Sequence, residues 1–259
     1  MVSSGEIFAI SREPKPISGH STQSSASNAV LQISPIAKAR DDRQPPLDEY
    51  FNSLFTAFGP QHWWPGRTQF EIIVGAILTQ NTSWTNVEHA IENLRRSHLL
   101  TPRAIRKVRL PKLESLIRPS GYFRQKARKL KAFCDFLQRE YRGSLRKMFA
   151  TPTLILREKL LGVFGIGPET ADSILLYAGG HAVFVVDAYT KRILSRHGWA
   201  GEKSKYEAMR WMFERQFPGN AKRFNEFHAL IVNTGKNFCL PQKPLCDRCP
   251  LGRYLEEGR

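Results

Sequence analysis

Apolar residues recur at helical spacing along most of the chain. In the clearest case, the side chains at positions 70, 73, 74, 77 and 78 are all apolar, which places them on one face of a helix. Thr68 and Glu71 stand just before this stripe at the spacing of a capping box, and they predict a helix start. The same spacing recurs at 85–88 and 204–207, and Thr-Pro pairs at 101–102 and 151–152 indicate two further starts. The pattern predicts a mainly helical body from about residue 46.

Two segments depart from this pattern. Residues 182–186 form a short apolar run, which we expect to be a buried extended connection rather than part of a sheet. Residues 1–45 are rich in Ser, Pro and Gln and have no apolar period, which predicts a disordered tail. The fold class predicted for the rest of the chain is all-α.

The net charge narrows the choice of partner. The 259 residues include 39 Lys and Arg against 23 Asp and Glu, a net charge of +16. Because such an excess is typical of proteins that bind a polyanion, we expect DNA or RNA as the partner, ahead of anionic lipid. No apolar stretch approaches the roughly 20 residues of a membrane span, and the amino terminus lacks the apolar segment of a secretory signal. These features predict an intracellular protein of the cytoplasm or nucleoid, without a membrane partner.

A glycine-rich segment at 161–171 carries the first candidate site. Gly162, Gly165 and Gly167 fall within six positions, and Pro168 suits the first turn of a following helix. Glycine lets a backbone approach a ligand closely, and the free N–H groups of a helix N-terminus attract anions. We therefore expect a hairpin between two helices whose backbone at Gly165, Ile166 and Gly167 binds phosphate. A plain helix-turn-helix corner is the alternative.

Asp187 is the second candidate. It follows the apolar run 182–186 directly, so a buried approach would deliver its carboxylate to the mouth of a cleft. It also precedes a helix expected to begin near Ala188, where an aspartate serves as an N-cap. Both roles are compatible.

Three of the four cysteines, Cys239, Cys246 and Cys249, fall within eleven residues near the carboxyl end, while Cys134 stands alone. In a reducing compartment, clustered thiols are more often metal ligands than disulfides. The spacing predicts a metal centre.

Taken together, these residues resemble a known family. The segments AILTQNT at 76–82 and VVD at 185–187, the hairpin and the terminal cysteines are similar to the helix-hairpin-helix (HhH-GPD) DNA glycosylases related to endonuclease III. The resemblance covers about residues 47–250. It implies an all-α fold of two helical subdomains with the active-site cleft between them. It also implies a monomeric enzyme that acts on damaged double-stranded DNA in base excision repair.

The resemblance further implies domain bounds and residue roles. Residues 67–182 would form a helical domain containing the hairpin, and 46–66 with 183–259 a discontinuous second domain. Asp187 would be the catalytic carboxylate. The hairpin would bind the DNA backbone, and the loop that carries Gln80 and Asn81 would enter the duplex.

One departure from the family pattern concerns the reaction. Members that also nick the strand carry a Schiff-base lysine two positions after the last hairpin glycine, where this chain has Glu169. Because a carboxylate cannot form an imine with the sugar, the sequence favours a monofunctional glycosylase in which water attacks C1′. Lys191 or another lysine taking over this role is the alternative.

A second departure concerns the metal. The resemblance implies a [4Fe–4S] cluster held by four cysteines, but the fourth position is Leu255. Three readings remain open: a cluster with a substitute ligand, a loop that has lost its metal and persists by packing, or a zinc site completed by His228.

Aromatic residues indicate the substrate. Trp63, Trp64 and Pro65 precede the first strongly apolar helix, and Trp84 follows Gln80 by four residues. Indoles suit a positively charged base, and purine alkylation creates one. With Glu169, these residues are the predicted base pocket, and the motifs look closest to the 3-methyladenine glycosylase branch. The alternative is that the tryptophans at 63 and 64 are core residues.

The predicted function is therefore hydrolysis of the N-glycosidic bond of an alkylated, 3-methyladenine-like purine flipped out of duplex DNA. A uracil or thymine mismatch glycosylase, or an endonuclease III-like enzyme, of the same fold is the closest alternative. A noncatalytic DNA-binding module is the alternative from another class.

Overall fold

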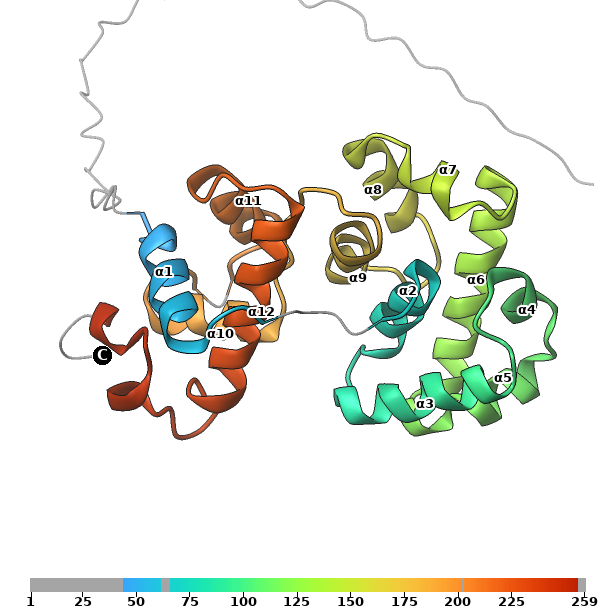
Figure 1. Ribbon diagram of the computed structural model, residues 1–259, viewed down its shortest axis with the longest axis horizontal. Coiled ribbons are helices and arrows are strands. Elements are labelled where there is room, and N and C mark those ends of the chain that lie inside the picture. The colour runs from blue at the N-terminus through green and yellow to red at the C-terminus, as the bar shows by residue number, and fades with distance from the viewer. Residues whose placement is uncertain (1–43, 62–65, 202, 256–259) are drawn as a thin grey trace, which may run out of the picture. The chain divides into compact units, whose positions relative to one another are not determined.

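The computed structural model describes residues 44–61, 66–201 and 203–255, and those from 44 onward belong to one compact unit. Its elements follow one another as shown in Figure 1. In chain order they are α1 (Leu47–Phe58), α2 (Gln69–Leu78), α3 (Trp84–Arg96), α4 (Pro102–Lys107), α5 (Leu110–Leu116), η1 (Arg118–Ser120), α6 (Phe123–Tyr141), α7 (Leu145–Phe149), α8 (Thr153–Leu161), α9 (Pro168–Ser173), η2 (Ile174–Ala178), α10 (Ala188–Arg196), α11 (Tyr206–Gln216), α12 (Ala221–Asn237), η3 (Cys246–Arg248) and η4 (Gly252–Tyr254). The described residues contain no strand, which confirms the all-α prediction.

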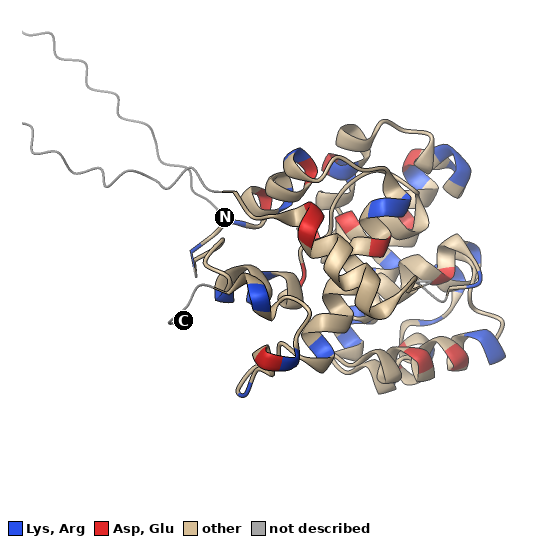
Figure 2. Cartoon of the chain, turned by 60° about the vertical axis from the view of Figure 1, so that its left-hand side comes forward, with Lys and Arg blue, Asp and Glu red and all other residues tan. Residues whose placement is uncertain are grey.

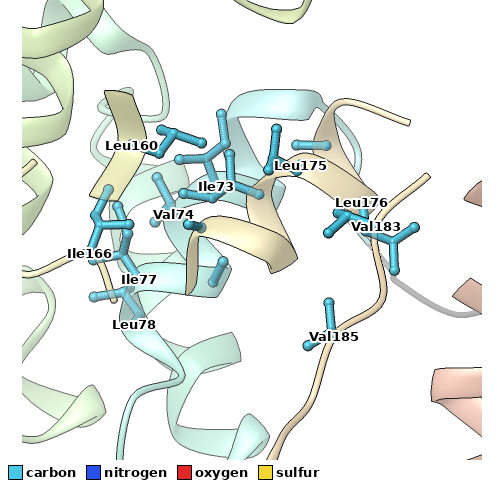
Figure 3. Packing of buried hydrophobic residues seen from close by; sticks show 14 of the residues in the cluster. Ile73, Val74, Ile77, Leu78, Leu160, Ile166, Leu175, Leu176, Val183 and Val185 are labelled. Atoms are coloured by element: carbon cyan, nitrogen blue, oxygen red, sulfur yellow. The ribbon is translucent and has the colours of Figure 1, made fainter. Parts of the chain in front are cut away.

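Helix α2 is the centre of the first group of helices. The apolar stripe predicted from the sequence is buried on it, and α2 packs against α3, α6, α9 and η2. Figure 3 shows Ile73, Val74 and Ile77 of this helix among apolar side chains of the neighbouring elements. The Thr68 hydroxyl accepts a hydrogen bond from the Glu71 amide, so the helix begins at the predicted cap.

A second group of helices forms around α12. Both α10 and α1 pack against it, so the first described helix joins the last long one. Phe51 of α1 meets Phe227 of α12 edge to face, with ring centroids 5.5 Å apart. The described part of the chain is thus two helical groups, as the fold prediction required. The exact domain bounds at residues 67–182 and 46–66 with 183–259 stay predictions, and the predicted tail at 1–45 lies almost entirely outside the described residues.

An extended segment connects η2 to α10. Val183, Phe184, Val185 and Val186 are all buried and belong to no sheet, which confirms the prediction of a buried connection. The Phe184 amide donates to a carboxylate oxygen of Glu214 at 3.0 Å, so a side chain rather than a second strand satisfies this backbone. The connection carries the chain directly to Asp187.

A buried ion network joins α8, α9 and α11. The Arg157 guanidinium donates to both carboxylate oxygens of Asp172, at 2.6 and 3.0 Å, and to Glu207 at 2.7 Å. The Tyr206 hydroxyl donates to Asp172 at 2.9 Å, and the same hydroxyl oxygen accepts the Val186 amide at 3.4 Å. The network therefore ties the two helical groups together one residue before Asp187.

Three of the predicted helix starts are wrong by one or two positions. Helix α3 begins at Trp84 after Ser83, one residue before the predicted box, and α8 begins at Thr153 with Pro152 as its cap residue. The hydroxyl of Ser204 accepts from the Gly201 amide instead of capping α11, which starts after Lys205. Local spacing locates these helices, but turn hydrogen bonds decide the residue at which each one begins.

Candidate active site

The hairpin joins α8 to α9 through a glycine turn. Gly165 has φ +79°, a left-handed conformation, and Gly167 is the cap residue of α9. A Cβ on Gly165 would lie 2.4 Å from Cγ of Lys129, whereas one on Gly167 would meet no atom of the described residues within 4 Å. The side chain of Ile166 is buried, so this residue can present only its backbone to a ligand. The turn thus has one face closed by protein and one face open.

Gln80 connects the loop after α2 to this hairpin. Its amide nitrogen donates to the Gly165 carbonyl at 3.2 Å and to the Thr170 hydroxyl at 2.9 Å, and its amide oxygen accepts from Lys129. Gln80, Asn81 and the hairpin backbone consequently line one open groove. The predicted DNA-binding residues Gln80, Asn81, Gly165, Ile166 and Gly167 are all brought together there.

A buried lysine holds the base of the same loop. Lys126 donates to the carbonyl of Leu78 at 2.9 Å and to that of Ser120 at 2.6 Å. Burial and the nearby charge of Lys129 lower the pKa of Lys126 to about 8. The end of α2 and the turn before α6 are therefore fixed to one side chain.

Asp187 is both a helix cap and a pocket residue, as the two compatible sequence readings allowed. One carboxylate oxygen accepts from the amide of Thr190 at 2.8 Å and from its hydroxyl at 2.9 Å, and this caps α10. The other oxygen lies 3.6 Å from Nε2 of His228. The side chain is 14 % exposed and lines a pocket.

This pocket, adjoining the groove, has a volume of about 350 Å³ and draws its walls from both helical groups. Of the predicted residues, Gln80, Trp84, Glu169 and Asp187 all line it. Trp63, Trp64 and Pro65 lie outside the described residues. The remaining lining is mixed polar and apolar, and includes Ala76, Ser173, Tyr177, Val185, Tyr189, His228, Val232 and Lys236.

Glu169 and Asp187 are two carboxylates in one pocket with different environments. The crowding of the Glu169 carboxyl group by protein and the charge of Asp187 raise the pKa of Glu169 to about 7, although Lys191 opposes the shift. When two titratable groups share a site and one has its pKa raised, the shared proton resides there first. Glu169 therefore takes up a proton near neutral pH.

The sequence interpretation missed the roles of Tyr177 and His228. The hydroxyl of Tyr177 and Nδ1 of His228 are hydrogen-bonded at 2.6 Å, and His228 is buried beside Asp187. His228 lines the pocket of Asp187, whereas the cysteines line a different cavity. The suggested zinc site that uses His228 is therefore wrong. The sequence feature that could have revealed His228 is the spacing of positions 228, 232 and 236. This spacing places His228, Val232 and Lys236 on one face of α12.

The terminal cysteines line a separate small cavity. Cys239, Cys246 and Cys249 border it, and so does Leu255, where a fourth thiol would be required. Within the described part of the chain, no group of three or more His, Cys, Asp or Glu side chains is placed to hold a metal ion. The donor set does not fit a cluster held by four cysteines.

Two arginines of α10 donate hydrogen bonds to this loop. Arg192 donates to the carbonyl oxygens of Cys239 and Gly235 at 2.6 and 2.8 Å. Arg196 donates to Sγ of Cys239 at 3.1 Å and to the Pro241 carbonyl at 2.7 Å. These contacts hold the loop against α10.

The basic residues are spread over the described part of the chain. Figure 2 shows Lys and Arg on helices throughout the described residues, with Asp and Glu among them. In those residues, no helix has the length and apolar character needed to cross a membrane.

The fold, the hairpin and the carboxylate pocket together define a DNA repair protein, and comparison with known proteins identifies the family. Residues 74–218 match the HhH-GPD superfamily of base excision DNA repair proteins, and the chain belongs to this family of DNA glycosylases. It is 48% identical over 206 residues to a protein of Methanocaldococcus jannaschii that is named for a proposed role as a DNA repair glycosylase. That alignment covers 79% of this chain and 93% of the relative.

Two solved structures are similar in fold. The 3-methyladenine DNA glycosylase of H. pylori, bound to 1,N6-ethenoadenine, is 29% identical and has a TM-score of 0.65, with 73% of this chain and 97% of that one covered. A non-covalent endonuclease III–DNA complex is 24% identical and has a TM-score of 0.70, with 82% and 94% covered. The second likeness shows the fold alone.

Proposed function

We propose that this protein is a monofunctional DNA glycosylase that removes an alkylated, 3-methyladenine-like purine from duplex DNA. The observation that carries the proposal is a single pocket that contains Asp187, Trp84 and, at the position of the Schiff-base lysine, Glu169. The similarity to a 3-methyladenine glycosylase supports this choice of substrate. We further propose that the protein acts as an intracellular monomer.

The reaction uses the groove and the pocket in turn. The hairpin and the loop of Gln80 hold the duplex, and the damaged base leaves the stack for the pocket at a cost of a few kcal/mol. Trp84 and the anionic form of Glu169 favour a cationic base there. Asp187 stabilises the positive charge that develops on the sugar and accepts a proton from the attacking water. The products are the free base and an abasic site in an intact strand.

A base-release panel tests this function. Duplexes that carry 3-methyladenine, 7-methylguanine, a uracil:guanine pair or a thymine:guanine pair are incubated with the protein, and released bases are separated by chromatography. We expect release of the alkylated purines. Release of pyrimidines alone would favour the mismatch enzyme, and tight DNA binding with no release would favour the noncatalytic module.

Borohydride trapping tests the monofunctional character separately. Lys191 lines the groove and Lys236 lines the pocket, so either amine is a candidate for an imine with the sugar. We expect no trapped protein–DNA adduct and no strand cleavage beyond the heat-labile abasic site. A trapped adduct lost in Lys236→Gln or Lys191→Gln would overturn this part of the proposal.

Glu169 gives the proposed activity a pH dependence. Because its pKa is raised to about 7, the carboxyl group gains its negative charge between about pH 6 and 8. We expect the half-saturating concentration for a 7-methylguanine duplex to fall several-fold across this interval in the wild type and to stay level in Glu169→Gln. Binding to undamaged duplex serves as the control for general electrostatics. Parallel pH curves for the two proteins would contradict the prediction.

Gly165 gives a prediction for DNA affinity. In Gly165→Ala the left-handed backbone costs about 1–2 kcal/mol, and the new Cβ displaces Lys129. We expect the free hairpin to relax to another turn conformation and the affinity for duplex DNA, measured by fluorescence anisotropy, to fall about tenfold, because binding must restore the strained turn. Gly180→Ala is the matched control, since Gly180 has φ +69° with no atom near its Cβ and lies outside the hairpin. Equal losses in both variants would attribute the effect to general destabilisation.

A further inference from the structure

The two oxygens of the Asp187 carboxylate have different surroundings. One is fully engaged by the amide and hydroxyl of Thr190. The other has Nε2 of His228 3.6 Å away. Nε2 is itself buried and has no hydrogen-bond partner among the residues that the structure describes. Because an unsatisfied buried polar atom is costly, an unpartnered nitrogen directed at a carboxylate requires an explanation.

The partner of the opposite ring nitrogen decides which proton His228 carries. Tyr177 Oη lies 2.6 Å from Nδ1. Full burial lowers the pKa of His228, although Asp187 opposes this, so the imidazole is neutral at neutral pH with one N–H. If that proton were on Nδ1, the lone pair of Nε2 would face the Asp187 anion. With the proton on Nε2, the Tyr177 hydroxyl donates to Nδ1 and Nε2–H is directed at Asp187.

We propose that His228 is a positioning residue for Asp187, held by Tyr177 as the Nε2–H tautomer so that it donates toward the carboxylate oxygen that Thr190 leaves open. This inference rests on the proposed function, because it assigns His228 a part in the reaction of Asp187. A small approach of the two side chains closes the 3.6 Å separation to a hydrogen bond. The carboxylate then has a fixed orientation toward the pocket.

The surrounding charges explain why such a donor is needed. Glu169 of α9 lines the same pocket as Asp187, and the charge of Asp187 raises the pKa of Glu169. Besides His228, the other titratable side chains that line the pocket in the described residues are Tyr177 of η2, Tyr189 of α10 and Lys236 of α12. Lys191 of α10 opposes the shift in the pKa of Glu169. A donor on the second oxygen of Asp187 offsets part of the repulsion between the two carboxylates.

A pair of substitutions separates the two contacts of His228. His228→Asn retains an acceptor where Nδ1 stands but has no donor for Asp187, whereas His228→Gln places an amide N–H near the position of Nε2. We expect single-turnover base release to fall about 10- to 100-fold in His228→Asn, with much of it restored in His228→Gln. Affinity for an abasic duplex and the melting temperature should match between the two variants. The acid limb of the rate should move to higher pH in His228→Asn.

Nitrogen NMR of the uncomplexed wild-type protein tests the arrangement without relying on activity or on a variant that folds. Two-bond proton–nitrogen correlations of the His228 ring are expected to report a protonated Nε2 and an acceptor Nδ1, and to change in Tyr177→Phe. An Nδ1–H tautomer or an imidazolium at neutral pH would overturn the inference, as would equal release rates for His228→Asn and wild type. Absence of base release by the wild type would count against the proposed function instead. In that case the tautomer seen by NMR would still show whether His228 donates toward Asp187.

Discussion

Asp187→Asn is expected to reduce base release by about 10³-fold, in line with the loss of an electrostatic group in a pre-organised site. Asparagine has the same size as aspartate and is an equally good N-cap, so its side-chain oxygen can still accept from the Thr190 amide. Helix α10 should therefore keep its start. What disappears is the negative charge that stabilises the sugar cation and the base that accepts the proton of water. Single-turnover release of 7-methylguanine measures the effect.

Asp187→Ser provides the matched control, since serine also caps a helix but has no carboxylate. Both variants should bind duplex DNA and melt close to the wild type, and both should be inactive. Asp187→Ala adds the loss of the cap, at about 1 kcal/mol of stability. Full release by Asp187→Asn would show that another residue supplies the charge and would refute the mechanism.

Arg157→Met is expected to lower the free energy of unfolding by about 3–5 kcal/mol, the usual cost of leaving a buried charge without its partner. Asp172 has 0% of its side chain exposed and receives two hydrogen bonds from Arg157. Without Arg157, only Tyr206 still donates to that carboxylate among the contacts found in the described residues. Denaturant unfolding monitored by circular dichroism measures the loss.

The pH dependence of this loss has a defined sign. Burial already raises the pKa of Asp172 despite Arg157, and removing the guanidinium raises it further. A carboxyl group whose pKa is higher in the folded state destabilises the protein as the pH rises, because only the unfolded chain ionises freely. Arg157→Met should therefore lose less stability at pH 5 than at pH 7.5.

Arg106→Met is the control for the buried pair. Arg106 and Asp135 form an ion pair in which both side chains are at least half exposed. Pairs of this kind contribute about 0–1 kcal/mol. Similar losses for Arg106→Met and Arg157→Met would indicate that burial of Asp172 has no special cost.

Sequence patterns predicted the features that depend on neighbouring residues. The stripe on α2, the glycine turn at Gly165 and the cap at Asp187 all follow from local spacing, and the extended run 182–186 follows from its apolar character. These predictions succeeded because backbone conformation and capping are set within a few residues. Gln80, Trp84 and Glu169 were placed near Asp187 through the family resemblance.

Local sequence patterns did not predict the contacts between segments that are far apart in the chain. His228 meets Tyr177, 51 positions away, and Gln80 meets Gly165, 85 positions away. A lone histidine on an apolar helix gives no sign of its partner, so His228 was considered only as a metal ligand. The missing fourth cysteine was visible in the sequence, but the arginines that hold the loop in place became evident only from the fold.

The buried network of Arg157, Asp172 and Tyr206 has a consequence for how a base is selected. Because Tyr206 also accepts the amide of Val186, both walls of the pocket are anchored beside Asp187 before any DNA is bound. Under the proposed function, the pocket is already formed, and the DNA duplex is the partner that changes conformation. Ease of release from the duplex then adds to the preference of the pocket for a cationic base, so weakly stacked or weakly paired bases reach Asp187 most often.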